Sequence, residues 1–207
     1  MNRFKKFLAA PIVAAAALSA CTVPTPAPST NTLAQQLLAD TGDNAAGFDN
    51  EWYDFDIVTQ AVLLFPDLVE AASNPEAELT AFLPNDRAFQ VLVADLTGNW
   101  VWDEQGVFNA VASLGTDTVK TVLTYHLVGS KISAADALAS NGAKLTTLQG
   151  GQITVHVENP ALSLIRLEDN DPSDGDGGII FSKFNIGGSL ANGYAHGISK
   201  VLRPVDL

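Results

Sequence analysis

The stretch that decides the fold is LTAFLPNDRAF, residues 79–89. Its first five residues form a short apolar run that predicts a buried strand, and Pro84 ends that strand because proline cannot donate a ladder hydrogen bond. Asn85 and Asp86 are residue types that cap helices, so the spacing predicts a helix over residues 87–95. A strand that leads directly into a capped helix indicates that both elements share one core.

Outward from this stretch, helical patterns come first in the chain and strand patterns come later. We expect helices over residues 33–40, 54–65, 66–72, 87–95, 107–114, 118–124 and 133–139. We expect further strands over residues 125–128, 144–148, 152–157, 161–167, 179–181 and 195–202, with Gly150 and Gly151 turning the central hairpin. Because helices and strands do not alternate regularly, the predicted fold class is α+β rather than a doubly wound sheet.

The first twenty residues have the pattern of an export signal. Arg3, Lys5 and Lys6 precede an apolar run of about eleven residues, which is too short to span a membrane. Cys21 is the only cysteine of the chain, and the small residues before it resemble a bacterial lipobox. The resemblance implies that residues 1–20 are removed and that Cys21 carries lipid. The alternative is an ordinary signal peptide with an incidental cysteine.

A predicted tether follows the export signal. Residues 21–32 are rich in Pro, Thr and Ser, a composition that favours an extended chain, and the folded domain is expected over residues 33–207. Thr22 rather than Asp follows the cysteine, which by resemblance to Gram-negative sorting favours the outer membrane. We therefore expect an exported protein that lipid anchors to the cell envelope, at the outer membrane or the cell surface.

The chain beyond the export signal is strongly acidic. It carries 8 basic and 23 acidic side chains, a formal charge of −15. Such a surface repels nucleic-acid phosphates and anionic lipid headgroups. We therefore expect no nucleic-acid partner, and contact with the membrane only through the lipid. The single cysteine excludes an intrachain disulfide.

Three motifs in chain order resemble the fasciclin (FAS1) domain family. Residues 79–89 are similar to its first signature, VLTYHLV at 122–128 to its Tyr-His motif, and HGISKVLRP at 196–204 to its closing strand. Between them, LTTLQGG at 145–151 fits the central hairpin of the family. The chain thus resembles a bacterial lipoprotein that carries a single FAS1 domain.

The resemblance implies a β-wedge of short strands packed with several helices. It also implies a non-enzymatic adhesion or interaction module whose partner is a protein or glycan on a cell surface or matrix. The family motif falls on Asn85, Asp86, Tyr125 and His126. In animal members the Tyr-His region is associated with integrin binding, and here only the position is carried over. The alternative function is a surface or periplasmic receptor that binds a glycan or small ligand.

His126 and Asp86 are the candidates closest to catalytic chemistry. Since a histidine among apolar neighbours is usually a hydrogen-bonded structural residue, we expect His126 to be structural and Asp86 to be either a helix cap or the partner of the imidazole. If the two interact, they should be energetically coupled. Together they would form two-thirds of a nucleophilic triad, but the chain has no G-x-S-x-G elbow and no free cysteine, so we expect no enzyme. The spacings of His126, His156 and His196 match no transition-metal pattern.

Two segments depart from the family pattern and look like insertions, and the first of them, TGNWVWDEQG at 97–106, contains two tryptophans. Trp100 and Trp102 flank Val101, so a strand would place both indoles on one side. They either pack over a satellite core or form an exposed platform for a sugar or protein partner.

The second insertion, EDNDPSDGDGG at 168–178, is rich in aspartate. Its candidate ligands are Asp169, Asp171, Asp174 and Asp176. They form either a solvated acidic loop or a calcium site, and the loop resembles an EF-hand only loosely because its glycine is misplaced and no glutamate follows at the right distance. We expect no cofactor other than this possible calcium.

Overall fold

The computed structural model describes residues 29–40 and 47–206. The predicted export signal, Cys21 and most of the predicted tether lie outside the described residues. The helices are α1 (Leu33–Asp40), α2 (Asp56–Leu63), α3 (Pro66–Ser73), α4 (Asp86–Thr97), α5 (Glu104–Ala112), α6 (Thr116–Tyr125) and α7 (Ala134–Ala139). The strands are β1 (Leu79–Pro84), β2 (Leu127–Val128), β3 (Lys144–Thr146), β4 (Gln152–Asn159), β5 (Leu164–Glu168), β6 (Gly177–Gly178) and β7 (Gly193–Ile198). None of these helices has the length and hydropathy that a membrane span requires.

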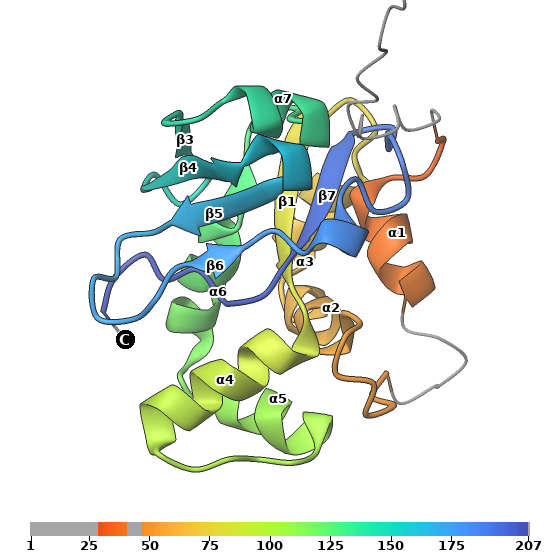
Figure 1. Ribbon diagram of the computed structural model, residues 1–207. Helices are drawn as coiled ribbons and strands as arrows, with labels where there is room; N and C mark the ends of the chain where they lie inside the picture. The colour runs from red at the N-terminus through yellow and green to blue at the C-terminus, as the bar shows by residue number, and fades with distance from the viewer. Residues whose placement is uncertain (1–28, 41–46, 207) are drawn as a thin grey trace, which may run out of the picture.

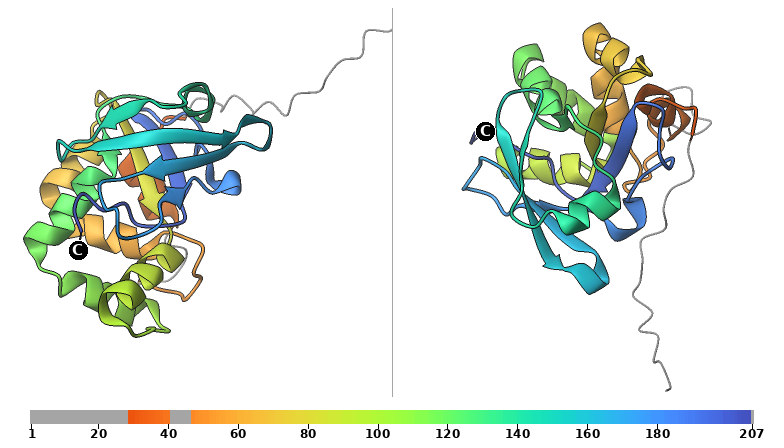
Figure 2. Two further views of the ribbon diagram at one scale, coloured as in Figure 1. Left: turned by 60° about the vertical axis from the view of Figure 1, so that its left-hand side comes forward. Right: turned by 90° about the horizontal axis from the view of Figure 1, so that it is seen from above.

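Two small sheets make up the β part of the domain. The first has the strand order β2-β1-β7, with β1 antiparallel to β2 and parallel to β7. The second is the antiparallel sheet β3-β4-β5-β6. Seen from above, helices α1, α3 and α6 lie on one side of β1 and β7 and the second sheet lies on the other (Figure 2). Helices α4 and α5 occupy the end of the molecule opposite α7 (Figure 1).

Strand β1 is buried along its whole length because it has a core on each face. Leu79, Ala81 and Leu83 pack into the core that the helices form, and Phe82 packs into the core between the sheets. Successive side chains of a strand point to opposite faces, so one apolar run serves both cores. The second core also contains Tyr125 and several residues of β4, β5 and β7.

Gly193 lets β7 approach β1 closely. The parallel register pairs Leu79 with Gly193 and Pro84 with Ile198. Gly193 has a φ of 152°, and a Cβ atom at this position would lie 1.7 Å from the carbonyl oxygen of Leu79. Only glycine fits where β7 begins.

The predicted α+β class is confirmed, and the differences from the predicted elements are local. Tyr125, which we expected in a strand, is the last residue of α6, because the backbone N–H of His126 still bonds to the carbonyl of Val122. The strand expected from residue 161 begins at Leu164, because Pro160 starts a 3-10 turn before it.

Two further differences concern a strand and the tether. The strand predicted over residues 179–181 does not form: β6 ends before it at Gly178, and of these residues only Ile179 makes an isolated bridge, with Ile198. The part of the predicted tether that the structure describes is bonded to the domain, since the N–H of Ser29 donates to the carbonyl of Ser189 at 2.7 Å and Thr32 is buried. Residues 29–32 therefore contact the folded domain.

His126 is buried at the end of α6 and joins three parts of the chain. Its Nδ1 donates to the carbonyl of Val122 at 2.8 Å, and its Nε2 accepts the backbone N–H of Leu202 at 2.9 Å. Its own carbonyl accepts the N–H of Phe82 in β1 at 2.9 Å. A second proton on the ring would face the Leu202 N–H, and burial lowers the pKa of His126 to about 4.

We expect the free energy of unfolding to decrease as the pH falls from 6.5 to about 4. Between these pH values His126 binds a proton in the unfolded state but not in the folded state. The contribution of the neutral imidazole to the free energy of unfolding is therefore full above pH 6.5 and is lost as the pH falls towards 4. The shift corresponds to at most about 3 kcal/mol. His196 acts in the same direction, because burial lowers its pKa as well.

Chemical denaturation of wild type and His126→Asn at several pH values measures this contribution. The stability difference between the two proteins should shrink as the pH approaches 4. A difference that stays constant with pH would contradict the assignment of His126 as a buried neutral imidazole.

Candidate functional site

The connection between α4 and α5 presents two exposed indoles. Helix α4 ends at Gly98 in the left-handed conformation, with a φ of 70°, which glycine adopts without strain. Trp100 and Trp102 are 47% and 73% exposed. Their ring centroids are 6.0 Å apart with an interplanar angle of 27°, so the indoles stack. We call this pair the tryptophan platform.

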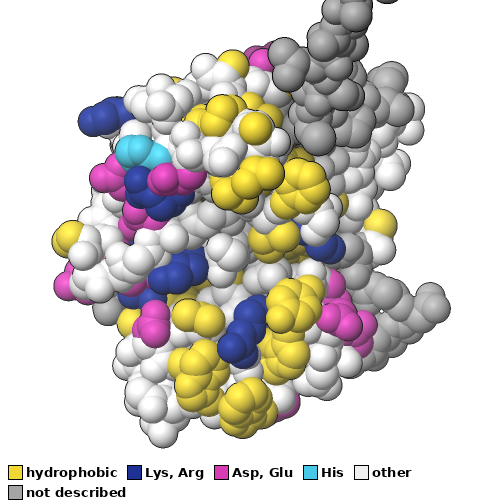
Figure 3. All heavy atoms as spheres, viewed as in Figure 1, with side chains coloured by type: hydrophobic (Ala, Val, Ile, Leu, Met, Phe, Trp, Pro, Cys, Tyr) yellow, Lys and Arg dark blue, Asp and Glu magenta, His cyan; other side chains and the backbone are white. Residues whose placement is uncertain are grey.

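Side chains of α4 hold the platform in place. Gln90 is fully buried and donates from Nε2 to the carbonyl of Val101 at 2.6 Å, between the two tryptophans. Arg87 hydrogen-bonds Gln90 and places its guanidinium carbon 4.8 Å from the centroid of a Trp100 ring. A cation over an indole face is attracted by the π electrons. Figure 3 shows a basic side chain surrounded by hydrophobic ones over α4.

The sequence analysis noted that a strand would place both indoles on one side, and the observed backbone here is not a strand. The segment between α4 and α5 has no regular structure. The indoles lie together all the same, because buried Gln90 fixes the peptide between them. Of the two interpretations of the pair, the large exposure of both rings favours the platform over a satellite core.

The family-motif residues lie inside the domain. Asn85, Asp86, Tyr125 and His126 are all at most 4% exposed. Asn85 caps α4 by accepting the N–H of Ala88 at 3.0 Å, and the Tyr125 hydroxyl donates to the carbonyl of Gln152 at 2.6 Å. These side chains shape the scaffold and do not form its outer surface.

The expected pair of His126 and Asp86 does not form. Both ring nitrogens of His126 are taken by backbone groups, as described above. Asp86 accepts the backbone N–H groups of Asp56 at 3.2 Å and Ile57 at 2.8 Å, and so caps α2 from outside that helix. Each residue therefore supports a different junction, and the energetic coupling expected between them has no structural basis.

Three of the four aspartates in the second predicted insertion form ion pairs with basic side chains, and the oxygens of the four do not converge as metal ligands. The ion pairs are Asp171 with Arg203, Asp174 with Lys200 and Arg203, and Asp176 with Arg166. Asp169 accepts the backbone N–H of Arg203 at 2.8 Å. Among the described residues, the acidic side chains whose oxygens are close enough to share a metal ion belong to a different group, described below. The arrangement favours an ion-paired acidic loop over the calcium site that the sequence also allowed.

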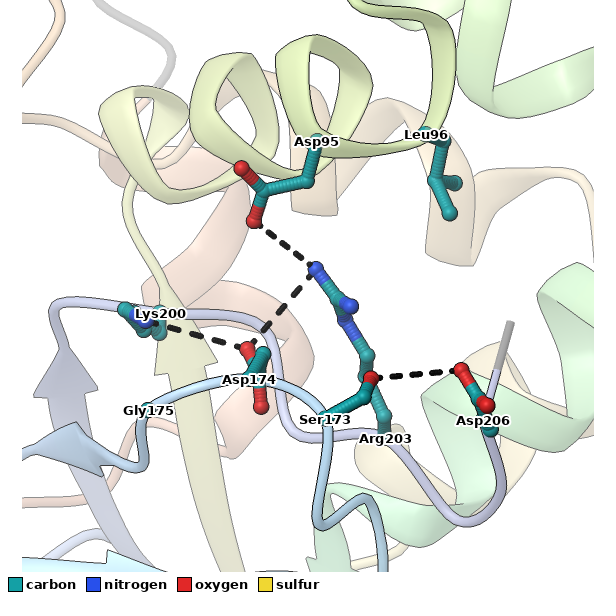
Figure 4. A pocket seen from close by; sticks show the side chains of 8 residues that line it. All are labelled: Asp95, Leu96, Ser173, Asp174, Gly175, Lys200, Arg203 and Asp206. Carbon is teal, nitrogen blue, oxygen red and sulfur yellow. Dashed lines mark hydrogen bonds and ion pairs between the residues drawn. The ribbon is translucent and has the colours of Figure 1, made fainter.

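Arg203 stands in a polar pocket of about 530 Å³ beside this loop (Figure 4). Asp95 and Asp174 flank its guanidinium at 3.1 Å and 3.7 Å, and Lys200 lies 3.8 Å from Asp174. Positive and negative groups thus neutralise each other across the pocket, which leaves little net field for a charged ligand.

A group of acids that the sequence analysis did not single out converges beside α4 and α5. Asp54, Asp86 and Glu104 each place a carboxylate oxygen within 4.8 Å of the others, and so do Asp49, Asp54 and Asp56. We call these five residues the carboxylate cluster. Asp56, Asp86 and Glu104 are fully buried. Each of the three is also the first residue of a helix, so the positive ends of α2, α4 and α5 meet here.

Backbone groups use part of the hydrogen-bonding capacity of the carboxylate cluster. Asp86 caps α2, as noted above, and Glu104 Oε2 accepts the N–H groups of residues 49 and 50 at 3.0 and 2.8 Å. In the sequence the only signal of this cluster is an acid at each helix start. An acid at a helix start is common, and the distances between these acids along the sequence do not predict that the three helix starts lie close together in the fold.

Comparison with known proteins agrees with this architecture. The model of the fasciclin domain family matches residues 55–204. Among solved structures, the chain is similar to a FAS1 domain pair from the insect cell adhesion molecule Fasciclin I, with a TM-score of 0.57 and 16% identity over 84% of this chain and 51% of that chain. The chain thus spans about half the length of that structure, and at this identity the likeness shows the fold alone. A search of curated proteins found no match.

The family match covers well over half of the chain, and it includes β1, the Tyr-His motif and β7. The fold observed here is similar to that of the FAS1 domain pair. The chain therefore belongs to the fasciclin (FAS1) domain family.

Proposed function

We propose that this protein is a non-enzymatic adhesion or interaction module that lipid holds at the cell envelope and that contacts its partner through the tryptophan platform. The fasciclin domains form a family of cell-adhesion modules. The proposed partner is a protein or glycan on a cell surface or matrix.

The observation that carries this proposal is the exposed and fixed tryptophan platform. Tryptophan is enriched among the residues that dominate binding energy, and Arg87 beside it belongs to the same enriched group. Because Gln90 already fixes the peptide between the indoles, a partner loses little conformational entropy by ordering them. The family-motif residues are buried, so direct contact with a partner has to come from other side chains.

A receptor for a glycan or small ligand is the second candidate function. The stacked indoles present a flat aromatic surface on which a sugar ring can pack, and Arg87 supplies hydrogen-bond donors at its edge. Both functions use the same platform, and they differ in whether isolated sugars bind.

The proposed attachment rests on the sequence of the first 32 residues. Cys21 would carry the lipid, which places the protein at the outer membrane or cell surface. The rest of the chain has 23 acidic and 8 basic side chains. Because an acidic surface is not attracted electrostatically to anionic lipid headgroups, membrane attachment requires another contact, and a lipid anchor supplies it.

Replacing both tryptophans should remove partner binding and leave the fold intact. We expect Trp100→Ala/Trp102→Ala to bind its partner from native cell envelopes about thirtyfold more weakly than wild type, because truncating a binding hot spot costs about 2 kcal/mol or more. Quantitative crosslinking and pull-down measure the loss. Sugar selectivity on a glycan array that disappears in the same variant would assign the platform to the receptor function.

Phe181→Ala is the matched control, because Phe181 is an exposed aromatic residue, 68% accessible, outside the platform. It should bind like wild type. All three proteins should unfold within about 0.5 kcal/mol of one another, as is usual for surface substitutions. Equal capture by wild type and the double variant would refute the platform as the contact surface.

Replacing the proposed lipid attachment site should release the protein from membranes. We expect wild type to partition into the detergent phase and Cys21→Ser to become soluble or to remain unprocessed, because serine cannot take the thioether-linked lipid. Phase separation followed by mass measurement of the N-terminus tests this. Equal partitioning of the two proteins would rule out the lipid anchor.

A further inference from the structure

Four buried oxygens of the carboxylate cluster have no hydrogen-bond partner. They are Asp54 Oδ1, Asp56 Oδ1, Asp56 Oδ2 and Glu104 Oε1. The described residues contain seven such buried side-chain atoms, so more than half of them fall in this cluster. The backbone N–H of Asp49 lies near Asp56, but it donates its hydrogen bond to Glu104 Oε2 at 3.0 Å and so does not pair the Asp56 oxygens. Buried polar atoms are almost always paired, so this concentration calls for a ligand.

No basic side chain of the described residues neutralises these acids. None of the ion pairs within 4 Å includes a member of the carboxylate cluster. Lys183 lies over the ring of Phe55, 5.0 Å from its centroid, and Arg87 is turned toward Trp100. The three helix starts each supply about half of a positive charge, which is well below the charge of five carboxylates.

We propose that the carboxylate cluster is a calcium site, with Asp54, Asp86 and Glu104 as ligands, the unpaired Glu104 Oε1 among the donor atoms, and the buried, unpaired Asp56 beside Asp54. Calcium takes oxygen ligands at about 2.4 Å, so two ligands on opposite sides of the ion are about 4.8 Å apart. The proposed ligands Asp54, Asp86 and Glu104 each have an oxygen within 4.8 Å of the others, and Asp54 is likewise grouped with Asp49 and Asp56. Each oxygen of Asp86 that accepts a backbone N–H keeps a second lone pair for the ion.

The donor set selects the class of metal. All five residues of the cluster offer carboxylate oxygen, which hard cations prefer over softer transition metals. Magnesium requires an octahedral shell at about 2.1 Å and retains several waters, whereas calcium accepts irregular shells built from several carboxylates. Calcium therefore suits this buried and charge-rich site better.

The acids of the cluster lie in an environment that disfavours their charged forms. Burial raises the pKa of Asp56 to about 7, and repulsion from Asp54, Asp49 and Glu104 adds to the effect. Burial also raises the pKa of Asp86 and that of Glu104.

The proposed ion would join three segments that are distant in the sequence. Asp54 and Asp56 lie at the start of α2, Asp86 begins α4, and Glu104 begins α5 immediately after the tryptophan platform. The site is thus independent of the partner proposed above, and it would brace the segment that carries the platform.

The test uses the full chain in detergent, with calcium chloride or a chelator and no other ligand. We expect millimolar calcium to raise the Tm of wild type, because an ion that binds only the folded state stabilises it. Asp56→Asn and Glu104→Gln keep the side-chain volume and remove the charge, so both should lose the calcium-dependent rise. Magnesium at the same concentration should raise the Tm less.

Asp176→Asn is the matched control, since Asp176 belongs to the acidic loop where the sequence allowed calcium and the structure shows an ion pair with Arg166. It should keep the full rise in Tm. Terbium luminescence excited through tryptophan gives a second measurement: calcium should displace terbium from wild type and Asp176→Asn, and Glu104→Gln should bind terbium about tenfold more weakly or worse. No calcium-dependent rise in wild type, or the same rise in Asp56→Asn, would overturn the site.

Discussion

The burial of β1 on both faces is the constraint on which the rest of the domain depends. Its alternating side chains enter a helical core on one side and a core between two sheets on the other. Its edges bond to β2 and β7, and its end leads without a loop into the cap of α4. The same few residues therefore place both sheets, the helix that supports the tryptophans, and Asp86, which in turn starts α2. A polar change in this strand would disturb all of these elements together.

Local chemistry accounts for what could be predicted from the sequence. The strand, cap and helix of residues 79–97 follow from neighbouring residues, and the α+β class follows from the order of helical and strand patterns. The partners of His126 could not be predicted, because backbone groups of Val122 and Leu202 satisfy it and backbone groups leave no trace in a sequence. The acids of the carboxylate cluster come from three helix starts about 20 to 50 residues apart, where each alone reads as an ordinary helix-start residue.

The predicted insertion at residues 97–106 contributes to both of the sites proposed above. It supplies the tryptophan platform, and at its other end it supplies Glu104 to the carboxylate cluster. Side-chain hydrogen bonds hold it in place, among them Gln90 to the carbonyl of Val101 and the N–H of Gly106 to Asp103 at 2.7 Å. A loop held in this way keeps an aromatic surface exposed without leaving its backbone free to move, which suits recognition by a rigid scaffold.

The parallel pairing of β1 with β7 has a consequence for how the chain comes together. Residues 79–84 pair with residues 193–198, so the central strand lacks one neighbour until nearly the whole chain is available. Contacts between such distant segments slow folding, because a long loop must close before any bonding is gained. Meanwhile the apolar β1 presents an open edge that can pair with another chain. A fragment that ends before residue 198 would keep this edge, and would be prone to self-association even though most of its residues are those of the intact domain.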